Sequence, residues 1–140
     1  MKQNRLFFLM SLLVFLGWTI SITVACENSV KSLQHYQTPD DLENVKVIKL
    51  SSNKNSSNFL IFIKSSVPPH RHLTHSESIY VISGEGKFTL GNKTMEIVAG
   101  DFINVPEGII HAVDVTSEEP LKVLSNQAPE FLGKDRIYVN

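Results

Sequence analysis

Cysteine is almost absent from this sequence, because Cys26 is the only one among its 140 residues. A single thiol cannot form a disulfide within the chain, which excludes a scaffold held together by internal disulfides. Stability must therefore come from a packed core. The hydrophobic content of 42% and the charged content of 19% are sufficient for one. The length fits one domain and not comfortably two.

The sequence also lacks a surplus of positive charge. Its formal net charge is −1, and without Lys2 and Arg5 only 11 basic residues remain against 14 acidic ones. Proteins that bind nucleic acid usually present a stripe of lysine and arginine to the phosphates, and no such stripe is found here. We therefore expect no nucleic acid among the partners.

Long amphipathic helical patterns and internal repeats are missing after residue 26. The chain instead has short β-rich runs, such as residues 59–64, 78–83 and 87–90, separated by glycine, proline and asparagine turns. Many short strands at close intervals predict an all-β sandwich or barrel. We expect three large apolar residues in its core: Phe88, Met95 and Phe102.

The N-terminus carries an export pattern. Lys2 and Arg5 precede an uncharged, apolar run from Leu6 to Cys26. This order is typical of a secretory signal peptide, which we place at residues 1–25. The residues directly before Cys26 resemble the lipobox of bacterial lipoproteins, in which the cysteine is lipidated and becomes the first residue of the mature protein.

Three outcomes for this segment are open. Lipidation of Cys26 would anchor the protein to a membrane. Cleavage after Ala25 without lipidation would give a soluble secreted protein with a free thiol. An uncleaved segment would be an N-terminal anchor, since its apolar run is near the ~20 residues that span a bilayer. All three place the domain outside the cytoplasm, and we expect it in the periplasm.

The remaining chain divides into a tether, a domain and a tail. Residues 26–44 are polar and read as a tether with one helical turn packed on the domain. A tether residue such as His35 is expected to face solvent. We place the β-domain at residues 45–128 and a tail at residues 129–140, where residues 137–139 can add an edge strand.

Histidine is concentrated around His70, His72 and His75. His70 and His72 are two residues apart, so on a strand their side chains point to the same face. Glu77 lies at an odd offset from His72, so residues 74–76 must turn or bulge if its carboxylate is to join them. His75 reads as a turn residue, with metal binding or proton transfer as the alternative.

A second stretch, residues 100–111, ends in His111. Its Pro-Glu-Gly segment at residues 106–108 predicts a turn between two short strands. The returning strand can bring His111 over the first histidine pair. Three imidazoles and a carboxylate suit Fe, Mn, Ni, Co or Zn better than Ca or Mg. On a six-coordinate ion they leave two positions for water or a substrate.

The two stretches resemble the paired sequence motifs of the cupin superfamily. The matching positions are His70, His72, Glu77 and Gly84 in the first motif and Gly100, Pro106, Gly108 and His111 in the second. Two positions depart from the family pattern, because Lys64 replaces its first glycine and Val115 its last asparagine. The resemblance covers residues 45–126. It implies a single-domain jelly-roll β-barrel whose metal ligands are His70, His72, Glu77 and His111.

Three classes of function are compatible with this resemblance. The first is a metal-dependent enzyme of dioxygenase, decarboxylase or isomerase type that acts on a small oxygen-rich molecule, with Glu77 as the candidate base. The second is a non-catalytic module that holds a metal or small ligand in the periplasm. The third is a metal-free, sugar-modifying enzyme, which the intact ligand set disfavours. Family members often form homodimers, so a dimer is the default expectation.

Overall fold

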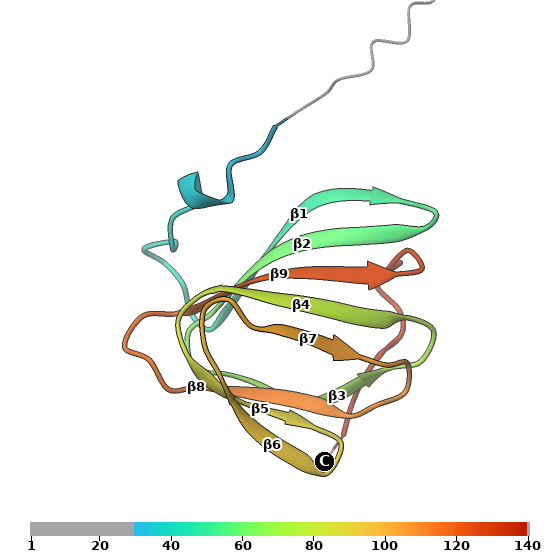
Figure 1. Ribbon diagram of the computed structural model, residues 1–140. Coiled ribbons are helices and arrows are strands. Elements are labelled where there is room, and N and C mark those ends of the chain that lie inside the picture. Colours follow the sequence, from blue (N-terminus) through green and yellow to red (C-terminus); the bar gives the residue numbers. More distant parts are fainter. Residues whose placement is uncertain (1–29, 140) are drawn as a thin grey trace, which may run out of the picture. The chain divides into compact units, whose positions relative to one another are not determined.

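Two five-stranded antiparallel sheets face each other in the computed structural model, which describes residues 30–139 (Figure 1). Sheet A has the strand order β1 (Val45–Asn53), β2 (Ser56–Ile63), β9 (Leu121–Ala128), β4 (Ser76–Ser83) and β7 (Phe102–Val105). Sheet B has the order β10 (Arg136–Tyr138), β3 (Ser66–His72), β8 (His111–Val115), β5 (Gly86–Leu90) and β6 (Lys93–Ile97). This is an all-β jelly roll, so the predicted fold class is confirmed.

The core lies between the two sheets, because alternate residues of each strand point inward. Both sheets contribute apolar side chains to it, among them Phe59 and Ile61 from β2 and Phe88 and Val113 from sheet B. Burial of this apolar surface is the main source of stability for a domain without disulfides. The expectation that Phe88 belongs to the core is confirmed.

Residues of β2 are buried on both faces of sheet A, which explains its nearly continuous apolar run. Leu60 and Phe62 point away from the main core and pack against Leu42 and Tyr36. The side chain of Lys122 donates hydrogen bonds of 2.7 Å to the carbonyl oxygens of Leu33 and Tyr36. The segment around the short 3₁₀ helix η1 (Leu33–His35) therefore covers the outer face of sheet A.

Two of the expected core residues are on the surface, and the predictions for Met95 and Phe102 are wrong. Phe102 is 67% exposed because Ile103 and Val105 take the inward positions of β7. The neighbouring position on a strand must then face outward. There Phe102 pairs with Tyr80 of β4, which is also exposed. Met95 lies on the edge strand β6, whose only buried residue is Ile97.

Gly84 follows β4 at a position that only glycine fits. Its φ is +82°, and a Cβ there would lie 2.8 Å from the Cα of Leu121. We expect Gly84→Ala to lower the free energy of unfolding by about 3 kcal/mol, from backbone strain and overpacking together. Gly100→Ala is the control, because Gly100 has φ +99° but no atom within 4 Å of the added Cβ. It should cost only about 1 kcal/mol in the same urea titration. Equal losses would contradict the role of the Leu121 contact.

The export signal is not part of the described structure. The signal peptide at residues 1–25 and the lipidation site Cys26 lie outside residues 30–139, so both stay predictions. Within the described range, no helix has the length and apolar character needed to cross a bilayer.

Candidate metal centre

Strands β3 and β8 bring three histidine side chains to the inner face of sheet B. His70 pairs with His111 across the two strands, and His72 follows two residues later on the same face. All three are buried, with exposed fractions of 2–4%, whereas Arg71 between the first two is exposed. One nitrogen from each of the three rings can be chosen so that all three atoms lie within 4.8 Å of one another. The two sequence stretches thus meet at one point, as predicted.

A turn fastens the second stretch to the first. The amide of Ile109 donates to the carbonyl of Pro106 at 3.2 Å, which closes the predicted turn. Gly108, with φ +77°, turns its own amide toward β3 and donates to the carbonyl of His72 at 2.7 Å. This bond ties the loop before His111 to the backbone of His72, so the positions of these two side chains depend on each other.

Glu77 reaches the same point from sheet A. A bend at residues 73–74 separates β3 from β4. It interrupts the strand alternation, as the odd offset of Glu77 requires if its carboxylate is to join the histidines. Its Oε2 lies 3.4 Å from Nε2 of His72 and 3.3 Å from Nε2 of His111. Ligand atoms that share an ion at about 2 Å are about 3 Å apart, so this spacing suits a common cation.

Backbone carbonyls decide which ring nitrogens face the site. Nδ1 of His70 donates to the carbonyl of Pro68 at 2.9 Å, and Nδ1 of His111 donates to that of Ile109 at 3.1 Å. Because a carbonyl oxygen can only accept, each Nδ1 carries the proton and each Nε2 keeps its lone pair. The Nε2 atoms of His72 and His111 are buried without a hydrogen-bond partner.

These orphaned nitrogens are the test of whether a metal fits. The lone pair of His111 faces a carboxylate oxygen of Glu77, and two acceptors in contact repel each other unless a proton or a cation lies between them. Buried polar atoms without a partner are costly. The donor set of three imidazoles and one carboxylate matches a divalent transition metal. The histidine cluster could therefore bind such an ion.

Two buried side chains of β9 orient Glu77. The hydroxyl of Ser125 and the amide of Gln127 both donate to Oε1, the latter at 3.1 Å, which leaves Oε2 for the histidines. Neither residue was predicted from the sequence. A signal was available, because Ser125 and Gln127 continue the inward-facing alternation of Leu121 and Val123 with polar side chains. A buried polar pair in a core strand indicates a partner inside the barrel.

The charges of the metal-free site also favour cation binding. Burial, together with the neighbouring His111, lowers the pKa of His70 to about 4. Burial opposes ionisation of Glu77. In the metal-free site, a proton between Oε2 and Nε2 of His111 or His72, together with the hydrogen bond from Ser125, stabilises the carboxylate more strongly. These interactions hold the pKa of Glu77 well below its ordinary value. At neutral pH His70 is thus neutral and Glu77 negative, as metal ligands must be.

The lowered pKa of His70 predicts that the metal-free protein loses stability in acid. The unfolded chain binds a proton at this histidine near pH 6.5 and the folded chain only near pH 4. Stability is therefore complete above pH 6.5 and falls as the pH drops toward 4; the lowered pKa of Glu77 acts in the same direction. In urea titrations with a chelator we expect a loss of about 2 kcal/mol from His70, allowing for solvent screening. His70→Gln should flatten the profile; a flat wild-type profile would contradict it.

A second cluster lies beside His72. His75 lies in the connection between β3 and β4, but its side chain is buried. Its ring centroid lies 4.2 Å from that of His72. Its Nδ1 lies 2.6 Å from Oδ2 of Asp135, which also accepts hydrogen bonds from the backbone and hydroxyl of Thr74. Asp135 could not be found from the sequence, because it belongs to the segment that reads as a tail. The cluster holds His75 against the ring of His72.

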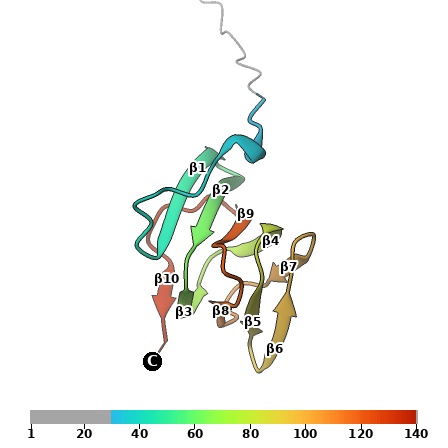
Figure 2. The same ribbon diagram turned by 90° about the vertical axis from the view of Figure 1, so that its left-hand side faces the viewer.

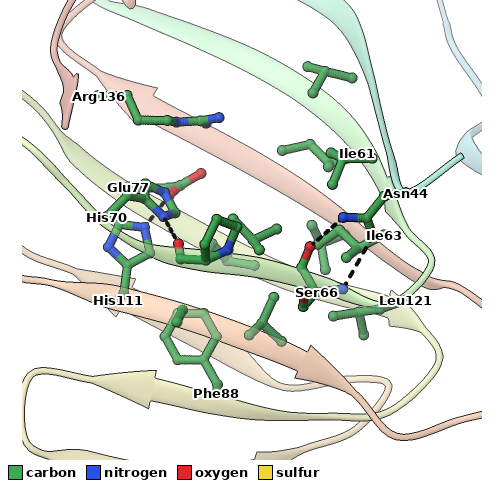
Figure 3. A pocket seen from close by; sticks show the side chains of 18 of the residues that line it. Asn44, Ile61, Ile63, Ser66, His70, Glu77, Phe88, His111, Leu121 and Arg136 are labelled. Atoms are coloured by element: carbon green, nitrogen blue, oxygen red, sulfur yellow. Dashed lines mark hydrogen bonds and ion pairs between the residues drawn. The ribbon is translucent and has the colours of Figure 1, made fainter. Parts of the chain in front are cut away.

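A cavity of about 240 Å³ opens beside His70, His111 and Glu77 (Figure 3). Its polar end includes His70, Glu77, His111, Arg136 and Tyr138. Apolar residues of both sheets form most of the remaining wall, including Ile61, Ile63, Ile79, Phe88, Leu121 and Val123. A small molecule in this cavity would lie next to His70, Glu77 and His111 and in contact with the apolar wall.

Comparison with known proteins assigns the chain to a family. The family described as Cupin domain matches residues 62–125, a range that contains all four candidate ligands. An uncharacterized protein of Aquifex aeolicus (strain VF5) is 36% identical over 98 residues, which cover 70% of this chain and 80% of that protein. The chain belongs to the cupin superfamily. Cupins commonly bind divalent metals, in agreement with the histidine cluster of this one.

Solved structures show the same fold in other cupin-like proteins. An uncharacterized protein with a double-stranded β-helix domain from Klebsiella pneumoniae has a TM-score of 0.68 at 20% identity, covering 79% of this cupin and 96% of that chain. An oxalate decarboxylase has a TM-score of 0.62 at 24% identity, covering 74% of this cupin but only 30% of its own chain. These similarities concern the fold.

Proposed function

We propose that this cupin is a metal-dependent enzyme that acts on a small oxygen-containing molecule. The observation that carries the proposal is the convergence of three imidazoles and an ionised carboxylate at the end of a cavity of about 240 Å³. Fe, Mn, Ni, Co or Zn suits this donor set, and when bound such an ion supplies Lewis acidity or, for redox-active metals, oxygen activation.

The residues of the site have distinct roles in this proposal. His70, His72 and His111 would hold the ion through Nε2, and Glu77 through Oε2. Ser125 and Gln127 hold the carboxylate in its orientation, as outer partners of metal ligands usually do. Glu77 is also the candidate base, since its ionised carboxylate lines the cavity and can accept a proton from a bound substrate.

The comparisons support an enzyme, at the level of the class. An oxalate decarboxylase shares the fold, so a decarboxylase stands beside a dioxygenase and an isomerase as a reaction type for this cupin. A non-catalytic module that only holds a metal or a ligand is the second function compatible with the same ligand set. The two functions differ in turnover, and this difference can be measured.

Elemental analysis followed by an activity screen tests the proposal. We expect about one divalent transition metal per chain in the purified protein. The Fe(II)-loaded protein should then consume oxygen with at least one compound from a panel of catechols, enols, flavonols and keto-acids, while decarboxylation and isomerisation of the same panel are followed with each candidate metal. Metal binding with no turnover of any compound would favour the non-catalytic module. Absence of metal would contradict the metal-dependent enzyme and leave only a module that holds a small ligand.

We further propose that this cupin is exported to the periplasm and anchored to a membrane through Cys26. The support is the position of the only cysteine, directly after an uncharged apolar run and a lipobox-like segment. Expressed as the full chain in a bacterium fed a clickable fatty acid, the protein should be labelled and sediment with membranes. Cys26→Ser should lose the label. A label that persists in Cys26→Ser would contradict lipidation at this residue.

A further inference from the structure

We propose that Arg136 makes the cavity a binding site for a monocarboxylate. In this inference, which rests on the proposed function and narrows its substrate class, the carboxylate pairs with the Arg136 guanidinium beside the metal ligands. A small apolar body, joined to the carboxylate, fills the remaining cavity. Arg136 would then be the residue that determines specificity for the acid.

Strand β10 delivers Arg136 to the cavity. It runs along the edge of sheet B next to β3 (Figure 2), with Arg136 opposite His72 and Tyr138 opposite His70. Residues paired across neighbouring strands point to the same side of a sheet. Arg136 and Tyr138 accordingly line the cavity, Tyr138 being 58% exposed, whereas Ile137 between them is not part of the lining. In Figure 3 the side chain of Arg136 lies at the end of the cavity that holds His70, Glu77 and His111.

Among residues 30–139, no carboxylate forms an ion pair with the guanidinium of Arg136. Its Nε is buried without a hydrogen-bond partner, and the ion pairs found within residues 30–139 all join a histidine to a carboxylate. The two nearby carboxylates have other partners. Glu77 accepts hydrogen bonds from Ser125 and Gln127. Asp135 contacts Thr74 and His75. Arg136 is half-buried, and its unpartnered Nε is the buried part of a positive group that lines the cavity, so the position favours a ligand that brings a negative charge.

The charge at this end of the cavity would be positive when a metal is bound. Arg136 lies opposite His72 across β10 and β3 and lines the same cavity as His70 and His111. A divalent ion would add two positive charges, and Glu77 supplies only one negative charge among the candidate ligands. An anionic ligand would therefore be attracted to the metal end by both the ion and the guanidinium.

The shape and chemistry of the site select a carboxylate among anions. A guanidinium forms two parallel hydrogen bonds with a carboxylate. Among the described residues that line the cavity there is no lysine and no second arginine, so a single guanidinium supplies the cationic hydrogen-bond donors, as a single carboxylate requires. The opposite wall consists largely of aliphatic residues and Phe88. A ligand with one charged end and one apolar end matches both walls.

Calorimetry with matched acids and amides tests the inference. The probes are valerate, isovalerate and phenylacetate against valeramide, isovaleramide and phenylacetamide, each titrated into metal-loaded full-length protein. We expect at least one acid to bind about tenfold tighter than its amide, since this is the fold-change for about 1.4 kcal/mol of charge-assisted hydrogen bonding. In Arg136→Gln this preference should vanish, while the metal content stays that of the wild type.

Arg71→Gln is the matched control, because Arg71 lies on the adjacent strand opposite Ile137 but is exposed on the outer face. It should keep the preference for the acid. Equal binding of acid and amide by the wild type, binding of none of the three acids, or an unchanged preference in Arg136→Gln would each overturn the inference. The titrations are repeated on metal-free protein. One outcome would support the carboxylate site while refuting the metal-dependent function. The purified protein would contain no metal, and the metal-free protein would still prefer the acid in a way that depends on Arg136.

Discussion

The variant His72→Ala should lose nearly all of its bound metal. His72 is the middle histidine of the cluster, and neither of its ring nitrogens has a hydrogen-bond partner. Its Nε2 lies 3.4 Å from Glu77 Oε2, the spacing expected of two ligands on one ion. Loss of an outer partner of a ligand lowers metal affinity by about 10–100-fold, so loss of the ligand itself should lower it by at least about 100-fold. Elemental analysis after dialysis against a metal buffer measures this.

The control for His72→Ala is His35→Ala. His35 is the exposed histidine at the end of η1, so the same change there should leave the metal content at the wild-type level. Replacing a buried imidazole by a methyl group also leaves a cavity, which can destabilise the protein. Circular dichroism and urea titration therefore show whether each variant is folded. A folded His72→Ala protein with wild-type metal content would remove His72 from the ligand set.

Glu77→Gln should both lower the metal affinity and abolish turnover. The substitution keeps the size of the side chain but removes the only negative charge among the candidate ligands, and it turns an acceptor toward His72 and His111 into a partial donor. We expect metal affinity to fall by about 100-fold and activity to stay absent when metal is supplied in excess. Titration with Co(II), followed by its visible spectrum, measures the affinity and also reports the change of ligand.

The variant Ser125→Ala distinguishes direct ligation of the metal by Glu77 from a role in which Glu77 only orients a histidine. Ser125 touches only the other oxygen of the carboxylate, so its loss should lower metal affinity by about tenfold and leave the Co(II) spectrum nearly unchanged. If Glu77 only orients a histidine from outside the ligand set, Glu77→Gln and Ser125→Ala should have similar, small effects. Equal effects of the two variants would therefore argue against direct ligation by Glu77.

The sequence predicted the position of the candidate ligands because strand geometry and spacing are local properties. Two histidines separated by one residue share a face wherever they lie on a strand, and the break before Glu77 follows from the odd offset alone. The Pro106–Gly108 turn was equally local. The all-β fold followed from the many short strands, whose number and spacing do not depend on which strand pairs with which.

What the sequence did not predict depends on pairing between distant strands. Arg136 and Asp135 join the site only because β10 pairs with β3, more than 60 residues earlier in the chain. No local pattern gives this pairing, and three residues are a weak strand signal. Phe102 was misassigned for a related reason, since only the register of β7 shows that its neighbour Ile103 faces the core. The polar end of the cavity is therefore where the structure adds most to the sequence.

The most direct test of the metal centre is an anomalous diffraction scan of a crystal of the purified protein. We expect one peak, at an absorption edge of a first-row transition metal, about 2.0–2.3 Å from Nε2 of His70, His72 and His111 and from Oε2 of Glu77. A peak between His72, His75 and Asp135 instead, or no peak near either group of residues in a protein crystallised without chelator, would contradict this expectation.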